Sequence, residues 1–331
     1  MAACATMLWL VPRLPWPSWI TLRARALRMD AARDTVQKTD FACPSCGEPL
    51  SAPGNGHELR CINGHSFNLA KEGHVHLLPP KRAKPGALLE SDEMVRASRA
   101  FFEAGGFALQ AASVAEEVAR ALSLSPPRPA GEAPQVLGAG CGEGVYLRHV
   151  EAAMKAADRD AGLWGTDQSK LAVRYASKRQ RAAARFAVVA PHRLPFAGGS
   201  MDVVFSAFAP AVGPVRDEFH RVLRPGGAVV VARAGSDHLQ ELRTLAGEEP
   251  WRPPKELTQG FGENYLRVRS QECFQGAAAS SLLEMTPFVR RAPQERRAAL
   301  QALAASGGLE TTVDVIISTH RVWLGTGGEP L

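Results

Sequence analysis

Short blocks of apolar residues recur along the second half of the chain, separated by segments whose apolar positions follow a helical period. Each block has the length of a buried strand. The blocks predict strands at residues 135–139, 163–167, 186–189, 201–208, 228–232 and 311–318. Helices are predicted from the end of the first strand to about residue 157, and over residues 171–184. Strands alternating with helices are typical of a mostly parallel sheet covered on both faces, so we expect an α/β fold.

The first 130 residues lack this alternation. Residues 41–80 are rich in turns, Cys and His, which is typical of a small β module held by a metal. A basic stretch at 81–90 has the composition of a linker. Residues 91–123 have a helical pattern, with Ser91 or Asp92 as the cap and a break near Gly105.

The overall composition is that of a soluble globular protein, with 45% apolar and 22% charged residues. The 331 residues suffice for one large domain and one small domain. No apolar run approaches the ~20 residues that span a bilayer, so we expect no membrane partner. The net charge of +6 permits an anionic partner. Six cysteines are too few for a disulfide scaffold at this length, which favours a reducing compartment such as the cytoplasm.

The first 29 residues are rich in arginine, tryptophan and proline and contain no acidic residue. Such a leader is typical of an organelle transit peptide, which would imply import into an organelle. The alternative is upstream sequence read through from a start codon ahead of Met29. The prolines would disrupt an amphipathic targeting helix and favour the second interpretation. Under both, we expect residues 1–40 to be a poorly ordered leader or extension.

Four residues of the N-terminal module have the types and spacing of a metal site. Cys43 and Cys46 form a C-x2-C pair, Cys61 follows after fourteen further residues, and His65 after three more. Two turns can place three sulfurs and one nitrogen around a tetrahedral Zn²⁺ ion, with no position left for a substrate. We therefore expect a structural zinc site that supplies much of the folding free energy of this module. Other nearby histidines are alternatives for the fourth ligand, namely His57, His74 and His76.

A glycine-rich turn follows the first predicted strand. Gly140, Gly142 and Gly144 alternate there, so the backbone can turn tightly and approach a ligand. A dinucleotide motif would need a glycine at 143 or 145, and Glu143 suits a cationic centre better than a pyrophosphate. Asp167 ends the next strand, where an acid can accept hydrogen bonds from ribose hydroxyls. Adenosine without a pyrophosphate indicates S-adenosyl-L-methionine as the cofactor.

Taken together, these features resemble the RlmA family of bacterial large-subunit ribosomal RNA (guanine-N1) methyltransferases. The resemblance runs from about residue 41 to the end of the chain. It is carried by the Cys/His cluster, the glycine turn and several further motifs, which are 67-FNLAKEG-73, 77-LLP-79, 99-RAFFEAG-105, 192-HRLPF-196, 209-AP-210, 224-RPGG-227, 238-HLQEL-242 and 285-MTPF-288.

The resemblance implies a class I S-adenosylmethionine-dependent methyltransferase domain (Rossmann-like) behind a small N-terminal zinc-ribbon-like domain that helps to recognise an RNA hairpin. It implies cofactor contacts at Phe107, Gly142, Glu143 and His238, beside those expected at Gly140 and Asp167. It also implies methylation of a guanine N1 in a hairpin loop of 23S ribosomal RNA, and family members can act as homodimers. The predicted parts are a leader (1–40), the zinc-binding module (41–80), a basic linker and helical connector (81–130) and the methyltransferase domain (131–331).

The chain departs from the family pattern at two positions. The family usually has Asp where this chain has Gly138, and often Tyr where Phe107 stands. If the acid normally orders the cofactor loop, Gly138→Asp should tighten cofactor binding or raise turnover. The same departure motivates an alternative function, a zinc-dependent ribosomal-RNA-binding protein whose methyl transfer is impaired or lost. A small-molecule methyltransferase is disfavoured, because a small substrate needs no separate gripping module.

The N1 proton of guanine must leave before or during transfer, so a proton acceptor or a water is expected near the target base. His192 and His238 are the candidate acceptors. We interpret His192 as a histidine of a loop or of the substrate lip, and the family resemblance favours His238 as a cofactor contact. Asp202 is interpreted as a structural acid, and residues 208–210 as a wall of the base pocket at the carboxyl edge of the sheet.

Overall fold

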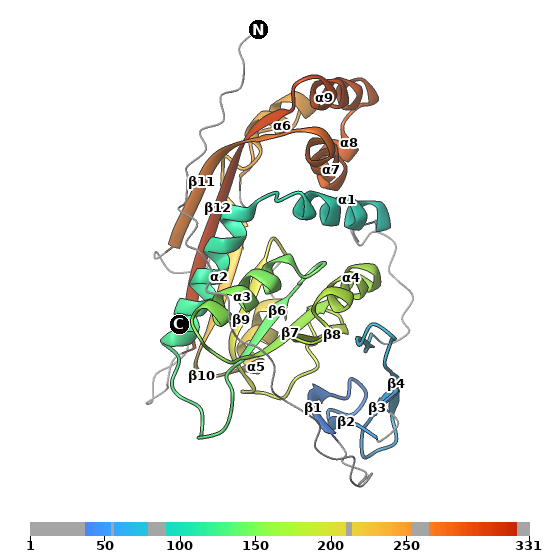
Figure 1. Cartoon of the computed structure of the whole chain (residues 1–331), viewed down its shortest axis with the longest axis vertical. Helices are drawn as coiled ribbons and strands as arrows, with labels where there is room; N and C mark the ends of the chain where they lie inside the picture. The colour runs from blue at the N-terminus through green and yellow to red at the C-terminus, as the bar shows by residue number, and fades with distance from the viewer. Residues whose placement is uncertain (1–36, 54–55, 79–90, 210–213, 253–264, 323–331) are drawn as a thin grey trace, which may run out of the picture. The chain divides into compact units, whose positions relative to one another are not determined.

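The computed structural model describes residues 37–53, 56–78, 91–209, 214–252 and 265–322 (Figure 1). The predictions made for the leader and for the basic linker at 81–90 lie almost entirely outside these residues. Within them, no helix combines the length and apolarity that a bilayer-spanning segment requires.

An eight-stranded mixed sheet forms the centre of the larger part of the chain. Its strands lie in the order β11-β12-β10-β9-β6-β7-β8-β5. All neighbours from β10 to β5 pair in parallel, whereas β12 pairs antiparallel with both β10 and β11. The bounds along the chain are β5 (Val75–His76), β6 (Gln135–Ala139), β7 (Gly162–Asp167), β8 (Ala184–Val188), β9 (Met201–Ala207), β10 (Leu223–Ala234), β11 (Tyr265–Phe274) and β12 (Leu309–Arg321).

The helices are α1 (Asp92–Glu103), α2 (Ala108–Ser123), α3 (Val145–Ala156), α4 (Lys170–Gln180), α5 (Pro214–Val222), α6 (Gln240–Ala246), α7 (Gly276–Met285), α8 (Pro287–Arg291) and α9 (Gln294–Ser306). The side chain of Ser91 caps α1 by accepting a hydrogen bond from the Met94 amide at 3.3 Å, as predicted. The helices and strands together confirm the predicted α/β class.

Alternate residues of the central strands enter two different cores. Val136 and Val203 belong to the core that α2, α3 and α4 cover, which extends to α6–α9. Leu137 and Val204, one residue further on, belong to the opposite core, which α5 covers in part. This period of two is the expected consequence of a sheet that is buried on both faces.

The N-terminal module is a four-stranded sheet in the order β1-β2-β3-β4, far from α7–α9 in Figure 1. Its strands are short: β1 (Gln37–Ala42), β2 (Pro49–Ala52), β3 (Glu58–Arg60) and β4 (Ser66–Asn68). The next strand, β5, leaves this module and pairs in parallel with β8 at the edge of the large sheet. The sequence did not predict this strand, because two residues are too few to show a period.

The predicted strands are confirmed, with shifts at their ends. Pairing with β12 extends β10 well beyond the predicted residues 228–232. The helix predicted over 171–184 is shorter, since α4 ends at Gln180 and β8 already begins at Ala184. The connection from β8 to β9, residues 189–200, contains turns and bends but no helix.

Asp202 is a structural acid, as predicted. Its carboxylate is 1% exposed and accepts hydrogen bonds from the Arg128 Nε at 2.7 Å and the Gln135 amide at 2.6 Å. The Arg224 Nε lies 2.8 Å from its other oxygen. One carboxylate therefore joins the loop before β6 to β9 and β10.

Asp202→Ala is expected to lower the free energy of unfolding by about 3–5 kcal/mol, because it leaves two poorly exposed guanidinium groups without their carboxylate. Urea denaturation measures the change. Glu132→Ala is the matched control: its carboxylate lies 3.5 Å from the same Arg128, but its side chain is 57% exposed. That variant should change stability by less than about 0.5 kcal/mol. Equal losses in the two variants would contradict a structural role specific to Asp202.

Candidate functional site

Two tight turns bring the four predicted metal ligands together. In the first, the Gly47 amide donates to the Cys43 carbonyl at 2.8 Å, and in the second the Gly64 amide donates to the Cys61 carbonyl at 3.0 Å. Both glycines have φ near +80°, the left-handed region that a side chain would make costly. The ligand atoms of Cys43, Cys46, Cys61 and His65 all lie within 4.8 Å of one another.

The spacing of these atoms fits a tetrahedral zinc ion. The Cys46 and Cys61 sulfurs are 3.7 Å apart, and the Cys61 sulfur lies 3.4 Å from the His65 Nδ1. Zn–S bonds of ~2.3 Å at tetrahedral angles would separate two sulfurs by ~3.8 Å. A side-chain contact with Asn63 lowers the pKa of the Cys46 thiol to about 6, which favours the thiolate. The alternatives His57, His74 and His76 are not members of this cluster.

The glycine turn lies at the carboxyl end of β6 and is closed against its neighbours. The amides of Gly140 and Cys141 both donate to the Thr166 carbonyl, at 2.8 and 2.9 Å. A Cβ on Gly140 would lie 2.6 Å from the Cβ of Ala209, two residues beyond the end of β9, so only glycine allows this close approach. Gly142 has φ +54°, and no atom of the described residues lies within 4 Å of its Cβ position, so a ligand can reach the backbone there.

The Asp167 carboxylate holds this turn from the end of β7. One oxygen accepts a hydrogen bond from the Gly142 amide at 2.9 Å, and the other accepts one from the Ser169 amide at 2.8 Å. Burial raises the pKa of the Asp167 carboxyl, and these backbone amides oppose the shift. Each oxygen keeps a further lone pair, so the group can accept ribose hydroxyls while it orders the turn.

Glu143 is a buried carboxyl with one oxygen unused. Its residue is 4% exposed, and its Oε2 lies 3.2 Å from the Arg148 guanidinium. Its Oε1 has no hydrogen-bond partner among the described residues. Burial raises the pKa of the Glu143 carboxyl, while Arg148 lowers it. An unpartnered buried acceptor of this kind is costly unless a ligand donates to it, which fits a cofactor with a cationic centre.

Three rings form an aromatic wall, which comprises Phe107, Phe208 and His238. Their centroids are 5.5 to 6.5 Å apart. Phe107 and His238 are buried, whereas Phe208 is 40% exposed. Phe107, Phe208 and Leu239, the residue after His238, all have φ between +53° and +57°. Non-glycine residues in this region carry strain and tend to cluster at functional sites.

His238 is held in one tautomer. Its Nδ1 accepts a hydrogen bond from the Asp314 amide at 3.3 Å, which leaves the proton of the neutral ring on Nε2. Burial lowers the pKa of His238 to about 4, so the ring is neutral at physiological pH. His192 is an exposed residue of the connection between β8 and β9 and is not a member of the aromatic wall.

Tyr146 is a residue of this region that the sequence analysis missed. Its ring centroid lies 6.2 Å from that of Phe208, and its hydroxyl is buried without a hydrogen-bond partner in the described chain. Burial, reinforced by Glu143, raises the pKa of the Tyr146 hydroxyl. Its place in the chain is the signal that was available, because Tyr146 lies in the first turn of α3, directly after the glycine turn.

Gly138 lies against a neighbouring ring. Its strand position pairs with Phe205 of β9, and a Cβ there would lie 2.9 Å from the Phe205 ring. Phe205 is 2% exposed, so an acid at position 138 requires this buried ring to shift. That Gly138→Asp tightens cofactor binding or raises turnover stays a prediction, and the contact with Phe205 is a cost that the variant must overcome.

Two protein-family models match this chain. The model of the N-terminal zinc ribbon of RlmA matches residues 41–84, which contain all four cluster residues. A methyltransferase-domain model matches residues 136–227, which contain the glycine turn and Asp167.

Three relatives extend the match. YxjB of Bacillus subtilis, a putative 23S rRNA (guanine-N(1)-)-methyltransferase, is 31% identical over 86% of this chain and 98% of its own length. A putative enzyme of the same name from Micromonospora griseorubida is 37% identical over 60% of this chain and 67% of its own length. The 23S rRNA (guanine(748)-N(1))-methyltransferase of Streptomyces fradiae is 33% identical over 62% of this chain and 67% of its own length. The chain belongs to the RlmA family of 23S ribosomal RNA (guanine-N1)-methyltransferases.

Proposed function

We propose that this protein transfers a methyl group from S-adenosyl-L-methionine to N1 of a guanine in a hairpin loop of 23S ribosomal RNA. The strongest support for this proposal is that three features of a cofactor site occur together. The Asp167-held glycine turn, the unpartnered oxygen of Glu143 and the aromatic wall belong to one region, at the carboxyl edge of the sheet. Ligands of open α/β sheets bind at this edge, where the strand order reverses between β6 and β9.

The cofactor-binding residues are Phe107, Gly140, Gly142, Glu143, Asp167 and His238. When bound, the cofactor supplies a sulfonium methyl group that is already activated for transfer. The glycines let the backbone approach it, and Asp167 accepts ribose hydroxyls. The unpartnered oxygen of Glu143 would hold its cationic end. The chain needs no nucleophile of its own, so its contribution is alignment and exclusion of water.

Phe208 is the member of the aromatic wall that an incoming base can reach. The N1 edge of guanine is hidden in a duplex, so the base must come from a loop or leave its stack. A half-exposed aromatic ring is the surface on which an unstacked base settles. Phe208 therefore positions the target guanine beside the cofactor turn.

His238 holds the cofactor and does not take the N1 proton. In its tautomer the ring presents an N–H donor at Nε2, and the only basic nitrogen is already engaged by the Asp314 amide. The proton then passes to water or to another acceptor at the rim. This assigns different roles to the two histidines considered from the sequence.

We further propose that the zinc module grips the RNA hairpin and that the enzyme acts in the cytoplasm. The ability of family members to act as dimers is what supports a homodimer. If residues 1–29 are a transit peptide, the same chemistry takes place on organelle ribosomes.

The alternative function, RNA binding without transfer, was motivated by Gly138. The Asp167 carboxylate orders the cofactor turn through the Gly142 amide without an acid at position 138, which supports an active enzyme.

The direct test is transfer of labelled methyl from S-adenosylmethionine to unmodified 23S ribosomal RNA, with N1-methylguanine identified by mass spectrometry. Phe208→Leu should lower kcat/KM for RNA by roughly 10- to 100-fold, because it removes base stacking worth ~1–3 kcal/mol. Phe208→Tyr, which keeps the ring, should stay within about three-fold of the wild type. Cofactor binding with no transfer to any ribosomal RNA would support the RNA-binding alternative.

Purified protein is expected to contain about one zinc ion per chain. Cys46→Ala should release the metal, because it removes one of four ligands, and elemental analysis after gel filtration measures this. Cys273→Ala is the control, since this thiol is exposed and lies outside the cluster. Full zinc content in Cys46→Ala would exclude the assigned ligand set.

Asp167→Ala should weaken S-adenosylmethionine binding by about 1–3 kcal/mol, measured by calorimetry, because ribose hydroxyls lose their acceptor and the turn loses its support. Asp167→Asn keeps one carbonyl acceptor and should lose less. Asp160→Ala, a change at an exposed acid in the loop before β7, provides the control. An affinity unchanged in Asp167→Ala would remove this residue from the cofactor site.

A further inference from the structure

The zinc module and the large sheet share one hydrophobic core. Leu50 and Leu59 of the module belong to the same buried cluster as Leu137, Trp164 and Val204 of the sheet. Val36–Leu331 form a single compact unit, with no division between module and sheet. The module therefore packs on one face of the sheet and helps to bury it.

Three aromatic side chains form the centre of this shared core. Phe41, at the end of β1, lies edge-on to Trp164 of β7 with centroids 5.0 Å apart. It also lies 5.5 Å from Phe196, and Trp164 lies 5.6 Å from Phe196. All three are buried, so Phe41 fills space that the rest of the sheet leaves open.

The open space follows from the connection between β8 and β9. A crossover between parallel strands normally carries a helix that covers the sheet, but residues 189–200 form none. The zinc module covers the face on which this connection lies. It takes the place of the missing crossover helix.

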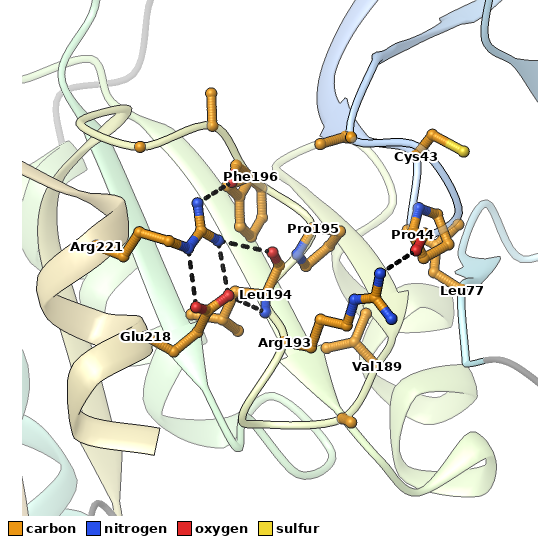
Figure 2. Close-up of a pocket in the computed structure, with 15 residues that line it drawn as sticks. Cys43, Pro44, Leu77, Val189, Arg193, Leu194, Pro195, Phe196, Glu218 and Arg221 are labelled. Atoms are coloured by element: carbon orange, nitrogen blue, oxygen red, sulfur yellow. Dashed lines mark hydrogen bonds and ion pairs between the residues drawn. The ribbon is translucent and has the colours of Figure 1, made fainter. Parts of the chain in front are cut away.

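Two hydrogen bonds join this connection to the first zinc turn. The Ala42 amide donates to the Pro195 carbonyl at 2.7 Å. The Arg193 guanidinium donates to the Pro44 carbonyl at 2.5 Å, across one side of a cavity of about 440 Å³ (Figure 2). Pro44 lies between the zinc ligands Cys43 and Cys46, so the position of its carbonyl depends on the metal.

The same connection reaches the cofactor turn at its other end. The Val189 amide donates to the Asp167 carbonyl at 2.9 Å, and the Asp167 carboxylate accepts from the Gly142 amide. A continuous series of contacts thus runs from the zinc turn through residues 189–195 to the glycine turn. Such a series couples two sites when the state of one site shifts the populations of the other.

We propose that zinc occupancy orders the cofactor turn, and that Arg193 is the positioning residue that links the two. The part that concerns S-adenosylmethionine rests on the function proposed above. The metal would then serve the methyltransferase sheet as well as the small module that binds it.

Hydrogen exchange with mass spectrometry on the full chain tests the coupling without any cofactor. Zinc-loaded and chelator-treated protein are compared. Removal of zinc should raise exchange within residues 41–76 and also within 136–145 and 162–169, which contain the glycine turn and Asp167. Faster exchange confined to 41–76 would overturn the proposal.

Arg193→Met tests the link itself while leaving all four zinc ligands in place. It should retain zinc, raise exchange within residues 136–145 and weaken S-adenosylmethionine binding about five-fold, the equivalent of one hydrogen bond of ~1 kcal/mol. Arg216→Met removes the same charge from an exposed site on α5 and should alter neither readout. Equal behaviour of the two variants would overturn the role of Arg193. Absence of cofactor binding in the zinc-loaded wild type would instead refute the proposed function, and the exchange data would still decide the coupling.

Discussion

A parallel sheet must have both of its apolar faces covered, and the arrangement of this protein depends on how that requirement is met. Helices cover one face in the ordinary way. On the other face the β8–β9 connection brings no helix, and the burial of Trp164 and Phe196 depends on Phe41 from the zinc module. The need to cover this second face accounts for the position of the module. It also accounts for the course of the β8–β9 connection and for the addition of β5 to the sheet edge.

The second organising feature is backbone strain at the candidate site. Phe107, Phe208 and Leu239 hold left-handed conformations that cost of order 1 kcal/mol each or more. Hydrogen bonds to neighbouring strands fix two of them, from the Phe208 amide to Ala232 and from the Leu239 amide to Thr312. The rigid sheet thereby imposes conformations that a free loop would relax, and it holds the aromatic wall in place before any ligand arrives.

Much of this could be predicted from the sequence, because the decisive signals are local. The spacing of Cys43, Cys46, Cys61 and His65 indicates two ligand-bearing turns. The short apolar blocks indicate buried strands. Contacts made over long sequence distances were beyond reach. The residues around Gly138 in the sequence do not indicate that the Phe205 ring packs against it. The residues around Phe41 likewise do not indicate its contact with Trp164. The acid at 167 was assigned to ribose alone, because its bond to Gly142 becomes visible only when β6 and β7 are paired.

The Phe41 contacts also bear on the order of events during synthesis. Domains fold as units as they leave the ribosome, the N-terminal ones first. The residues that bind zinc emerge early, but Phe41 has no Trp164 or Phe196 to pack against until more than 120 further residues have been made. Over that interval a bound zinc ion would hold the module together, while the apolar side chains that later join the shared core have no partners in the sheet. Capture of zinc by the emerging chain is therefore expected to keep the module folded until the strands that complete its core have been made.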